Sequence, residues 1–416
     1  MNTPATGIPD PYTLDLKDLD PSDGMLFKEQ AHWEYFKRLR EEDPVHFVDS
    51  EEFGPYWSIT KFNDIVFVDS HHELFSSEPS IVLGESEIDF EPPMFIAMDS
   101  PKHDVQRKAV TPAVTPQRLA EMSDLIRQRV CALLDSLPVG EEFNWVEKVS
   151  IELTTQMLAT LFDFPFEERH KLTYWSDVTT TAPTVSGEEG GMTEEERRDI
   201  LLECLECFAG LWKERAEAPV KNDFISLLAH SPDTKDMEPL EYLGNLMLLI
   251  VGGNDTTRNS MTAGVWALHN NPQEFAKLKA DESIIPNMVS EIIRWQTPLG
   301  HMRRIANEDV ELGGKTIKKG DKVVMWYISG NRDEEVIPNA DAFIVDRPKA
   351  RHHVSFGFGI HRCMGNRLGE MQLKILWEEI LKRFDRIEVT GEPGRVCSNF
   401  VMGYTDLPVI LHPRAS

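Results

Sequence analysis

A glycine-rich loop that ends in a single cysteine most constrains this chain. The segment reads SFGFGIHRCMGNRLGEMQLKILWEEIL over residues 355–381, with Cys363 between the glycines and a strongly helical run. The free N–H groups and the dipole of a helix N-terminus favour negative charge there. Cys363 is therefore expected to be a thiolate, and a thiolate is either a nucleophile or a metal ligand.

The composition indicates a large, acidic, soluble chain. Asp and Glu outnumber Lys and Arg by 70 to 43, which gives a formal net charge of −27. Nucleic acid and anionic membranes would repel such a chain, so neither is expected as its main partner. The 416 residues are 41% hydrophobic, and no Gly/Ser/Pro-rich linker divides them. We expect one domain over 1–416, with a polar segment at about 1–25 and no linker or reductase domain.

Nothing in the sequence is typical of a secretion signal or a membrane anchor. The N-terminus is polar and acidic, and the most apolar run, 243–253, is too short to span a bilayer. The five cysteines form no disulfide framework, which suits a reducing compartment. The C-x-x-C of Cys204 and Cys207 lies on one face of a helix, so a structural role is favoured over redox or zinc chemistry. We expect a cytoplasmic protein.

Helical periodicity dominates the sequence, and the strand-like segments are short. We expect a mainly α fold with a small β-rich portion, in which the loop 184–194 could act as a lid. Helices are predicted at 26–41, 102–136 (two helices, broken near Pro112 and Pro116), 144–162, 167–178, 194–217, 222–230, 239–270, 273–280, 282–296 and 365–384. Strands are predicted at 45–49, 56–60, 310–326 (with a hairpin turn), 386–390 and 407–412.

The residues around Cys363 suit a large, flat metal cofactor. Gly357, Gly359 and Gly365 would let the backbone lie close to a planar ring where a Cβ would clash. Phe356 would cover the sulfur, and backbone N–H groups after the cysteine would tune its electron donation. Haem iron with an axial thiolate is the single-cysteine metal site that needs no other protein ligand.

The run F-G-F-G-I-H-R-C-M-G resembles the haem-binding signature of cytochromes P450, F-x-x-G-x-[HR]-x-C-x-G. The resemblance implies the cytochrome P450 fold, haem b (iron protoporphyrin IX) bound through Cys363, and O2 as co-substrate. Three further motifs resemble those of the same family and follow in its order, so the resemblance covers residues from about 30 to 410. A helical scaffold with an incidental cysteine would not explain four ordered motifs.

The second motif is SEIIRWQTP, with Glu291 and Arg294 one helical turn apart. Such a pair could be an ordinary surface salt bridge, worth a few tenths of a kcal/mol. It resembles the E-x-x-R pair of the P450 family, which an arginine from the segment before the cysteine completes. DAFIVDRP supplies Arg347 at that place, and the implied triad is structural.

The third motif is LLIVGGNDTTRNS, inside the longest apolar helix. Its glycines could form a packing seam for small residues, or they could make room for a ligand beside the helix. Gly252, Gly253, Asp255 and Thr256 resemble the family's [AG]-G-x-[DE]-T motif. That likeness implies that Thr256 bonds back to a carbonyl and turns its hydroxyl towards the iron, while Asp255 relays protons.

The fourth motif is MDSPKHDVQRKAV, which resembles the family's M-D-P-P-x-H-x-x-x-R segment. Each cation here could be a solvated surface charge, but haem carries two carboxylates whose burial requires partners. The implied partners of the propionates are His103, Arg107, Arg304, His353 and His361.

The resemblance implies a monooxygenase that takes electrons from another protein. Because the Asp255–Thr256 pair is present, we expect O2 and two external electrons rather than hydrogen peroxide. We expect a 2Fe–2S ferredoxin as donor, reduced by an NAD(P)H-dependent reductase. Ferredoxins are acidic, so a local basic patch would dock them. The candidate docking residues are Lys108, Arg362, Arg367 and Lys374.

Several segments resemble the bacterial alkane-hydroxylating P450 group, among them VGGNDTTRNSM and IRWQTPLGHMRR. The likeness implies hydroxylation of the terminal methyl of medium-chain n-alkanes, fatty acids or both, and leaves chain length open. Alternatives are a hydroxylase of terpenes or other small hydrophobic compounds, and a haem-thiolate sensor without turnover. The candidate pocket residues, mostly aliphatic, are Leu249, Ile250, Leu299, Met302, Val354, Phe400 and Val401.

Overall fold

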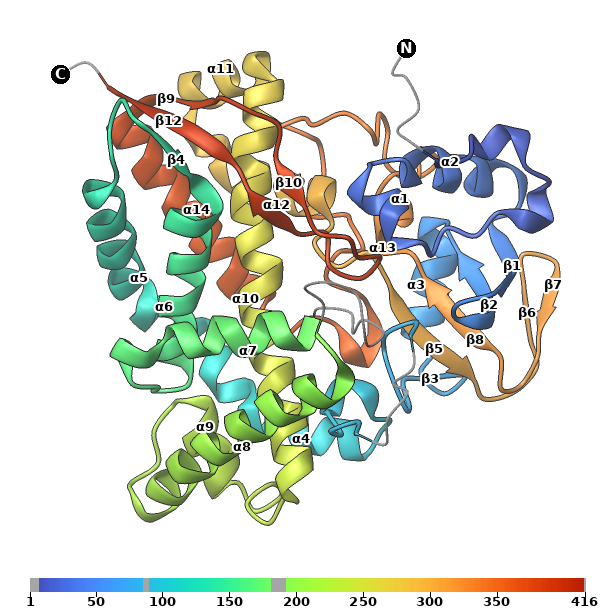
Figure 1. The fold of residues 1–416 in the computed structure, drawn as a ribbon, viewed down its shortest axis with the longest axis horizontal. Coiled ribbons are helices and arrows are strands. Elements are labelled where there is room, and N and C mark those ends of the chain that lie inside the picture. The colour runs from blue at the N-terminus through green and yellow to red at the C-terminus, as the bar shows by residue number, and fades with distance from the viewer. Residues whose placement is uncertain (1–6, 85–89, 181–191, 415–416) are drawn as a thin grey trace.

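The structure is a computed structural model in which residues 7–84, 90–180 and 192–414 are described. Helices form the larger part of the fold and short strands the smaller part, which confirms the predicted class (Figure 1). The helices are α1 (Gly24–Lys28), α2 (His32–Glu42), α3 (Phe62–Ser70), α4 (Lys102–Val110), α5 (Pro116–Ser136), α6 (Glu152–Leu161), α7 (His170–Thr180), α8 (Glu194–Glu217), α9 (Phe224–His230), α10 (Pro239–Asn270), α11 (Pro272–Ala280), α12 (Ile285–Gln296), α13 (Tyr327–Gly330) and α14 (Asn366–Arg383).

The 32-residue helix α10 runs through the middle of the helical part (Figure 1). It packs against α6, α7, α12 and α14, so it is buried on several sides. A helix in that position has to be apolar around most of its circumference, which accounts for its continuous run of apolar residues. Pro239 occupies its first turn, where the missing N–H would have no partner in the helix.

The strands lie mainly beside the helical part (Figure 1). The largest sheet has the order β1-β2-β8-β5-β3, with β2 and β8 parallel and the other neighbours antiparallel. A second sheet has the order β4-β12-β9, and β6-β7 and β10-β11 are separate pairs. The strands are β1 (Val45–Ser50), β2 (Gly54–Ile59), β3 (Phe75–Ser76), β4 (Glu142–Asn144), β5 (Met302–Ala306), β6 (Val310–Leu312), β7 (Lys315–Ile317), β8 (Lys322–Met325), β9 (Phe384–Val389), β10 (Gly394–Arg395), β11 (Tyr404–Asp406) and β12 (Pro408–Pro413).

Some elements differ from the sequence-based expectations. The helix expected at 26–41 is two helices, because Gln30 between them has a φ of +60°. The one expected at 144–162 starts as a π-helix, Val146–Ile151, before α6. Helix α3 and strand β5 were not predicted: both are short, and the apolar residues of α3 do not gather on one clear face of the helix. The predicted hairpin is present between β6 and β7.

Two further expectations concern a lid loop and membrane-spanning helices. Residues 184–191 of the loop expected to act as a lid lie outside the described residues. Among the residues that are described, no helix has both the length and the apolar character needed to cross a bilayer.

Candidate active site

The loop that carries Cys363 is fastened to its own start. The Cys363 N–H donates to the Phe356 carbonyl at 2.8 Å, and α14 begins shortly after the cysteine. The N–H groups of Gly365 and Asn366 face the sulfur, as expected at a helix N-terminus. The Cys363 side chain is exposed, yet enough protein surrounds it that burial raises the pKa of its thiol. The sulfur is therefore accessible but largely surrounded by protein.

The helix N-terminus is not sufficient to ionise this thiol. The adjoining N–H groups and the guanidinium of Arg107 lower the pKa of Cys363, but burial has the larger effect and raises it. In the protein without a bound metal, the helix position alone therefore does not lower the pKa of this thiol, and the thiolate stays a prediction for the metal-bound site. A metal ion bound to the sulfur would deprotonate it.

Gly357 and Gly359 were expected to lie against a planar cofactor, but in the structure they lie against Asp69. Both have positive φ values, +64° and +63°, which other residues rarely adopt. A Cβ at Gly359 would clash with the backbone oxygen of Asp69, and one at Gly357 would lie 3.0 Å from the Asp69 carboxylate. These two glycines make room for the end of α3 rather than for a planar ring. Gly365 has an ordinary φ of −87° and an open site, where a Cβ would lie 4.0 Å from the Cys363 sulfur.

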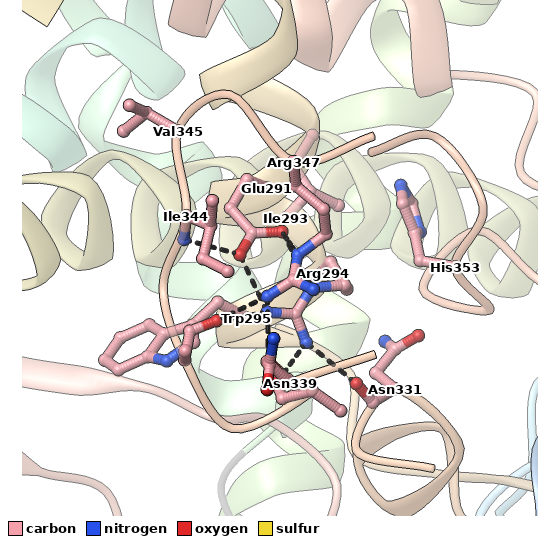
Figure 2. Close-up of polar contacts among 12 residues, drawn as sticks. Glu291, Ile293, Arg294, Trp295, Asn331, Asn339, Ile344, Val345, Arg347 and His353 are labelled. Carbon is pink, nitrogen blue, oxygen red and sulfur yellow. Dashed lines mark hydrogen bonds and ion pairs between the residues drawn. The ribbon is translucent and has the colours of Figure 1, made fainter. Parts of the chain in front are cut away.

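Glu291, Arg294 and Arg347 form one buried cluster (Figure 2). Arg294 donates to both carboxylate oxygens of Glu291, each time at 2.8 Å. Arg347 Nε donates to the same carboxylate at 2.9 Å. Arg294 also donates to the carbonyls of Asn331 and Ala340, at 2.8 and 2.6 Å. The structure thus excludes an ordinary surface salt bridge, because the carboxylate is fully buried and fastens the segment before the cysteine to α12.

In the middle of α10, the hydroxyl of Thr256 bonds to the helix backbone one turn earlier, next to a glycine that borders open space. The Thr256 hydroxyl donates to the Gly252 carbonyl at 3.0 Å. Gly252 is exposed, and a Cβ there would meet nothing within 4 Å. Gly253 differs, because a Cβ at that position would lie 2.8 Å from Leu158 of α6. Of the two glycines expected to make room for a ligand, only Gly252 borders open space; Gly253 is a packing position.

Asp255 points into the protein rather than along the same side as Thr256. Its carboxylate is completely buried, accepts from the Ser176 hydroxyl at 2.6 Å and pairs with Arg258. Arg258 also pairs at 2.8 Å with Asp177, which is half exposed. Burial raises the pKa of Asp255, although Arg258 and Ser176 lower it in part. The sequence analysis missed Arg258 and Ser176, yet the i, i+3 spacing of Asp255 and Arg258 was visible.

A cluster of histidines and arginines lies beside the cysteine loop. The ring centres of His103 and His361 are 4.2 Å apart. Burial lowers the pKa of His361 to about 2, and the nearby Arg304 adds to the effect. Arg107 donates to the carbonyl of Arg362, next to the cysteine. Among the described residues, both ring nitrogens of His361 and Nε2 of His103 are buried without a hydrogen-bond partner.

His353 does not join this cluster. Its ring packs on Phe356 with the ring centres 5.3 Å apart, and its Nδ1 accepts from the Ser355 N–H at 3.3 Å. Figure 2 shows it beside the Arg294 cluster. Burial lowers its pKa to about 3, with Arg294 as the next contributor. The expected role as a propionate partner is corrected: His353 packs behind the cysteine loop.

The sequence model of the cytochrome P450 family matches residues 103–402, well over half of the chain. The matched region contains all four clusters described above. This chain is a cytochrome P450.

Relatives with solved structures or curated functions span nearly the whole P450. CYP153D17 from Sphingomonas sp. PAMC 26605 is 50% identical, with a TM-score of 0.89, over 94% of this chain and 98% of that one. The linalool 8-monooxygenase of Pseudomonas putida is 35% identical over 96% of this chain and 99% of its own length. A methyl-branched lipid omega-hydroxylase of Mycobacterium tuberculosis is 28% identical over 90% of each chain.

The residues present fit the haem that membership of the family implies. The cofactor has two carboxylates, and His361 keeps one buried ring N–H without an acceptor. Nε2 of His103 would donate to a carboxylate only if that ring were protonated, because its Nδ1 already donates to Asp104. Arg107 and Arg304 add positive charge at the same place. Cys363 supplies a soft sulfur ligand at a helix N-terminus, and exposed Gly252 leaves space beside α10. We therefore place the haem of this P450 between α10 and the cysteine loop, as a proposal.

Two segments predicted to border the substrate pair with each other. The Gly300 N–H donates to the Phe400 carbonyl at 2.7 Å, and the Met402 N–H donates to the Pro298 carbonyl at 3.0 Å. Leu299 and Val401 form the β-bridge between them. The sequence placed these segments nearly 100 residues apart, so their pairing was not visible from periodicity.

His301 fixes these segments to a third one. Its Nδ1 lies 3.0 Å from the Asn399 carbonyl, and its Nε2 accepts from the Leu83 N–H at 3.2 Å. The side chain is fully buried, which lowers its pKa to about 4. Both nitrogens bind backbone, so this histidine presents no polar group to a substrate. Its ring edges instead pack on Trp326 and Phe400.

The candidate pocket residues divide into partly accessible and inaccessible side chains. Leu299 and Phe400 are half-buried, whereas Leu249, Met302 and Val401 keep only a few per cent of exposed surface. Ile250 and Val354 have 0% exposure. A residue on the wall of an open pocket keeps some accessible surface, so these two are corrected to core positions.

The four cations proposed for docking a redox partner are exposed. Lys374 pairs with Glu378 at 3.5 Å across one turn of α14, which offsets its charge. Lys108 borders a surface hollow of about 740 Å³, whose wall also includes Arg107 and Arg118. The exposed cations are Lys108, Arg362, Arg367 and Lys374.

Proposed function

We propose that this P450 hydroxylates the terminal methyl of medium-chain n-alkanes, fatty acids or both. The observation that carries the proposal is the apolar character of the paired segments at 298–302 and 398–402, where Leu299 and Phe400 keep accessible surface. The polar side chains within them, His301, Ser398 and Asn399, all form hydrogen bonds with backbone groups. Such walls suit a slender apolar chain held by burial and dispersion.

The regiochemistry follows from shape rather than from intrinsic reactivity. A primary C–H bond is stronger than the adjacent secondary one, so terminal attack requires that only the chain end reach the reacting centre. Three segments fastened through His301 give walls of fixed geometry. The named activity of the methyl-branched lipid omega-hydroxylase, at 28% identity, supports the same choice of carbon.

A terpene substrate is the second candidate. It is favoured by the linalool 8-monooxygenase, which is 35% identical over nearly the whole chain. A sensor without turnover is disfavoured, because Thr256 and Asp255 have the contacts of a proton-delivery site.

The chain's own residues suit the control of protons. Haem, when bound, would supply the activation of O2 and the insertion of one oxygen atom into a C–H bond. The single hydroxyl proton of Thr256 is donated to the Gly252 carbonyl, so its oxygen faces the site as an acceptor that can order a water molecule. The raised pKa of Asp255 suits a carboxyl that takes up and releases a proton.

Arg258 provides a route by which Asp255 could exchange protons with solvent. Its guanidinium contacts both buried Asp255 and the half-exposed Asp177. A shift of Arg258 towards Asp177 would free the Asp255 carboxylate from its partner. We propose that electrons arrive from a 2Fe–2S ferredoxin, reduced with NAD(P)H by its reductase, which docks on the exposed cations beside the cysteine loop.

The test is turnover of the reconstituted enzyme with a ferredoxin and its reductase on octane, dodecanoic acid and linalool, with products identified by mass spectrometry. We expect 1-octanol or the ω-hydroxy acid as the main product. Turnover of linalool alone would favour the terpene hydroxylase. Oxidation of the linear substrates mainly at internal carbons would contradict terminal selectivity.

A further inference from the structure

Asp69, near the C-terminus of α3, is a buried carboxylate with three donors. Arg304 Nη2 donates to one carboxylate oxygen at 2.8 Å. The Tyr327 hydroxyl and the Phe358 N–H donate to the other, at 2.8 and 2.7 Å. The Asp69 and Arg304 side chains are 1% and 3% exposed, so the charges are screened little by water.

The position of Asp69 on its own helix is unfavourable. A carboxylate near the C-terminus of a helix faces the negative end of the helix dipole. Burial of an unpaired charge there would add a further large cost. The hydrogen bonds from Arg304, the Tyr327 hydroxyl and the Phe358 N–H must therefore offset both the helix dipole and the cost of burial.

The cysteine loop is shaped around the same residue. Phe358 lies between Gly357 and Gly359, whose positive φ values let the loop approach Asp69. Any Cβ at Gly359 would clash with the Asp69 backbone oxygen. The chain therefore uses two glycines to bring the loop against Asp69, and one hydrogen bond to hold it there.

Arg304 also lies close enough to the unpartnered His361 to affect its pKa. Arg304 is the leading charged neighbour that lowers the pKa of His361, and its Nη1 donates to the Arg303 carbonyl at 2.8 Å. A guanidinium has five donor hydrogens, so these contacts leave donors for a carboxylate on the His361 side.

We propose that Asp69 is a positioning residue of the haem site, whose buried carboxylate joins the propionate-side cation Arg304 to the cysteine loop. The inference rests on the proposed placement of Arg304 at a haem propionate. Through these contacts Asp69 sets the orientation of Arg304, offsets its charge and fixes the loop that ends in the sulfur ligand. Outer contacts of this kind typically change metal-site affinity by about 10- to 100-fold.

The experiment uses the haem-loaded enzyme with the substitutions Asp69→Asn and Tyr327→Phe. Asp69→Asn keeps the size of the side chain and removes its charge, whereas Tyr327→Phe removes a neutral donor to the same carboxylate. We measure the rate of haem transfer to an excess of an acceptor apoprotein, and the reduction potential by spectroelectrochemistry. For Asp69→Asn we expect haem release about tenfold faster and a more positive potential, because a buried negative charge at the proposed haem site is lost. For Tyr327→Phe we expect an unchanged potential.

Two results would overturn the inference. The first is that Asp69→Asn and Tyr327→Phe have the same reduction potential and the same rate of haem release. Asp69 would then have a purely structural role. The other comes from Arg304→Gln, which also serves if Asp69→Asn fails to fold. If Asp69 joins the two groups, this variant should speed amide hydrogen exchange at Phe358, measured by mass spectrometry on the peptide around it. Unchanged exchange there would contradict the link.

The same variants separate this inference from the placement of Arg304. If Arg304→Gln releases haem no faster than the parent, the propionate role of Arg304 fails. If Arg304→Gln releases haem faster but Asp69→Asn does not, the placement of Arg304 stands and the role of Asp69 fails.

Discussion

Arg294 Nε lies 2.8 Å from a carboxylate oxygen of Glu291, with both side chains fully buried. Because the charges have left water, the pair stabilises the fold only while both members are present. We expect Arg294→Lys to destabilise the protein by about 3–5 kcal/mol, since lysine cannot reproduce the paired donors and the carbonyl contacts. Chemical denaturation of the haem-loaded protein measures this loss. A cost below about 1 kcal/mol would contradict the assigned role.

The Thr256 hydroxyl tests the proton-delivery account. In Thr256→Ala the donor to the Gly252 carbonyl and the acceptor facing the site are both lost. We expect O2 consumption to continue while product per O2 consumed falls roughly tenfold or more, with hydrogen peroxide released instead. Thr256→Ser keeps the hydroxyl and is the matched control. Equal coupling in the alanine and serine variants would remove Thr256 from the mechanism.

Leu299 tests whether a narrow pocket sets terminal selectivity. We expect Leu299→Ala to lower the ratio of terminal to subterminal alcohol roughly tenfold, because the removed methyl groups widen the site. Val354→Ala is the control, since Val354 is a core residue and its truncation should lower stability without changing that ratio. Gas chromatography of the octane products gives the ratio. If Val354→Ala lowered the ratio of terminal to subterminal alcohol and Leu299→Ala did not, Val354 rather than Leu299 would narrow the pocket.

His301 predicts a pH dependence of stability. It is protonated in the unfolded chain below pH 6.5 but stays neutral in the fold down to about pH 4, because full burial disfavours the charged ring more than the hydrogen bond to the Asn399 carbonyl favours it. The folded protein therefore loses stability as the pH falls through this window, by about 2 kcal/mol at pH 5 from this residue. Urea denaturation at pH 7.5 and 5 should show a smaller acid loss for His301→Gln than for the parent. Equal losses would contradict the assignment.

The docking patch predicts a salt-sensitive interaction with ferredoxin. Arg367→Glu and Lys374→Glu reverse exposed charges, so we expect weaker ferredoxin binding at low ionic strength, with the difference shrinking as salt is added. Lys374 is already paired with Glu378, and its reversal should have the smaller effect. Steady-state kinetics with varied ferredoxin measures both. If the rate depended on ferredoxin concentration in the same way for Arg367→Glu and the parent, these cations would not be the docking site.

Local signals in the sequence predicted most of the helices and the groups of residues at the site. The motifs at Cys363, Glu291 and Thr256 were visible because their spacing within one helix or loop carries the chemistry. Contacts between distant segments were not visible. Asp69 lies in an unpredicted helix, and its role depends on Arg304, Tyr327 and the cysteine loop meeting in space.

The errors of the sequence analysis have the same origin. His353 and Val354 lie close to Cys363 in sequence, yet both side chains are buried behind the loop. For Cys363 the sequence showed the helix N-terminus, which lowers the pKa of the thiol, but not the opposing effect of burial, which depends on the packed fold. Burial depends on how all the elements pack together, whereas sequence periodicity describes one helix or strand at a time. Burial at these positions could therefore not be predicted from the sequence.

The central claim is that Cys363 holds haem in a monooxygenase site. The most direct measurement is the absorption spectrum of the reduced, carbon monoxide-bound enzyme, for the parent and for Cys363→His. We predict the thiolate-ligated spectrum for the parent and its replacement by a nitrogen-ligated spectrum in the variant. A parent chain that binds haem without the thiolate spectrum, or a variant that keeps it, would contradict the account.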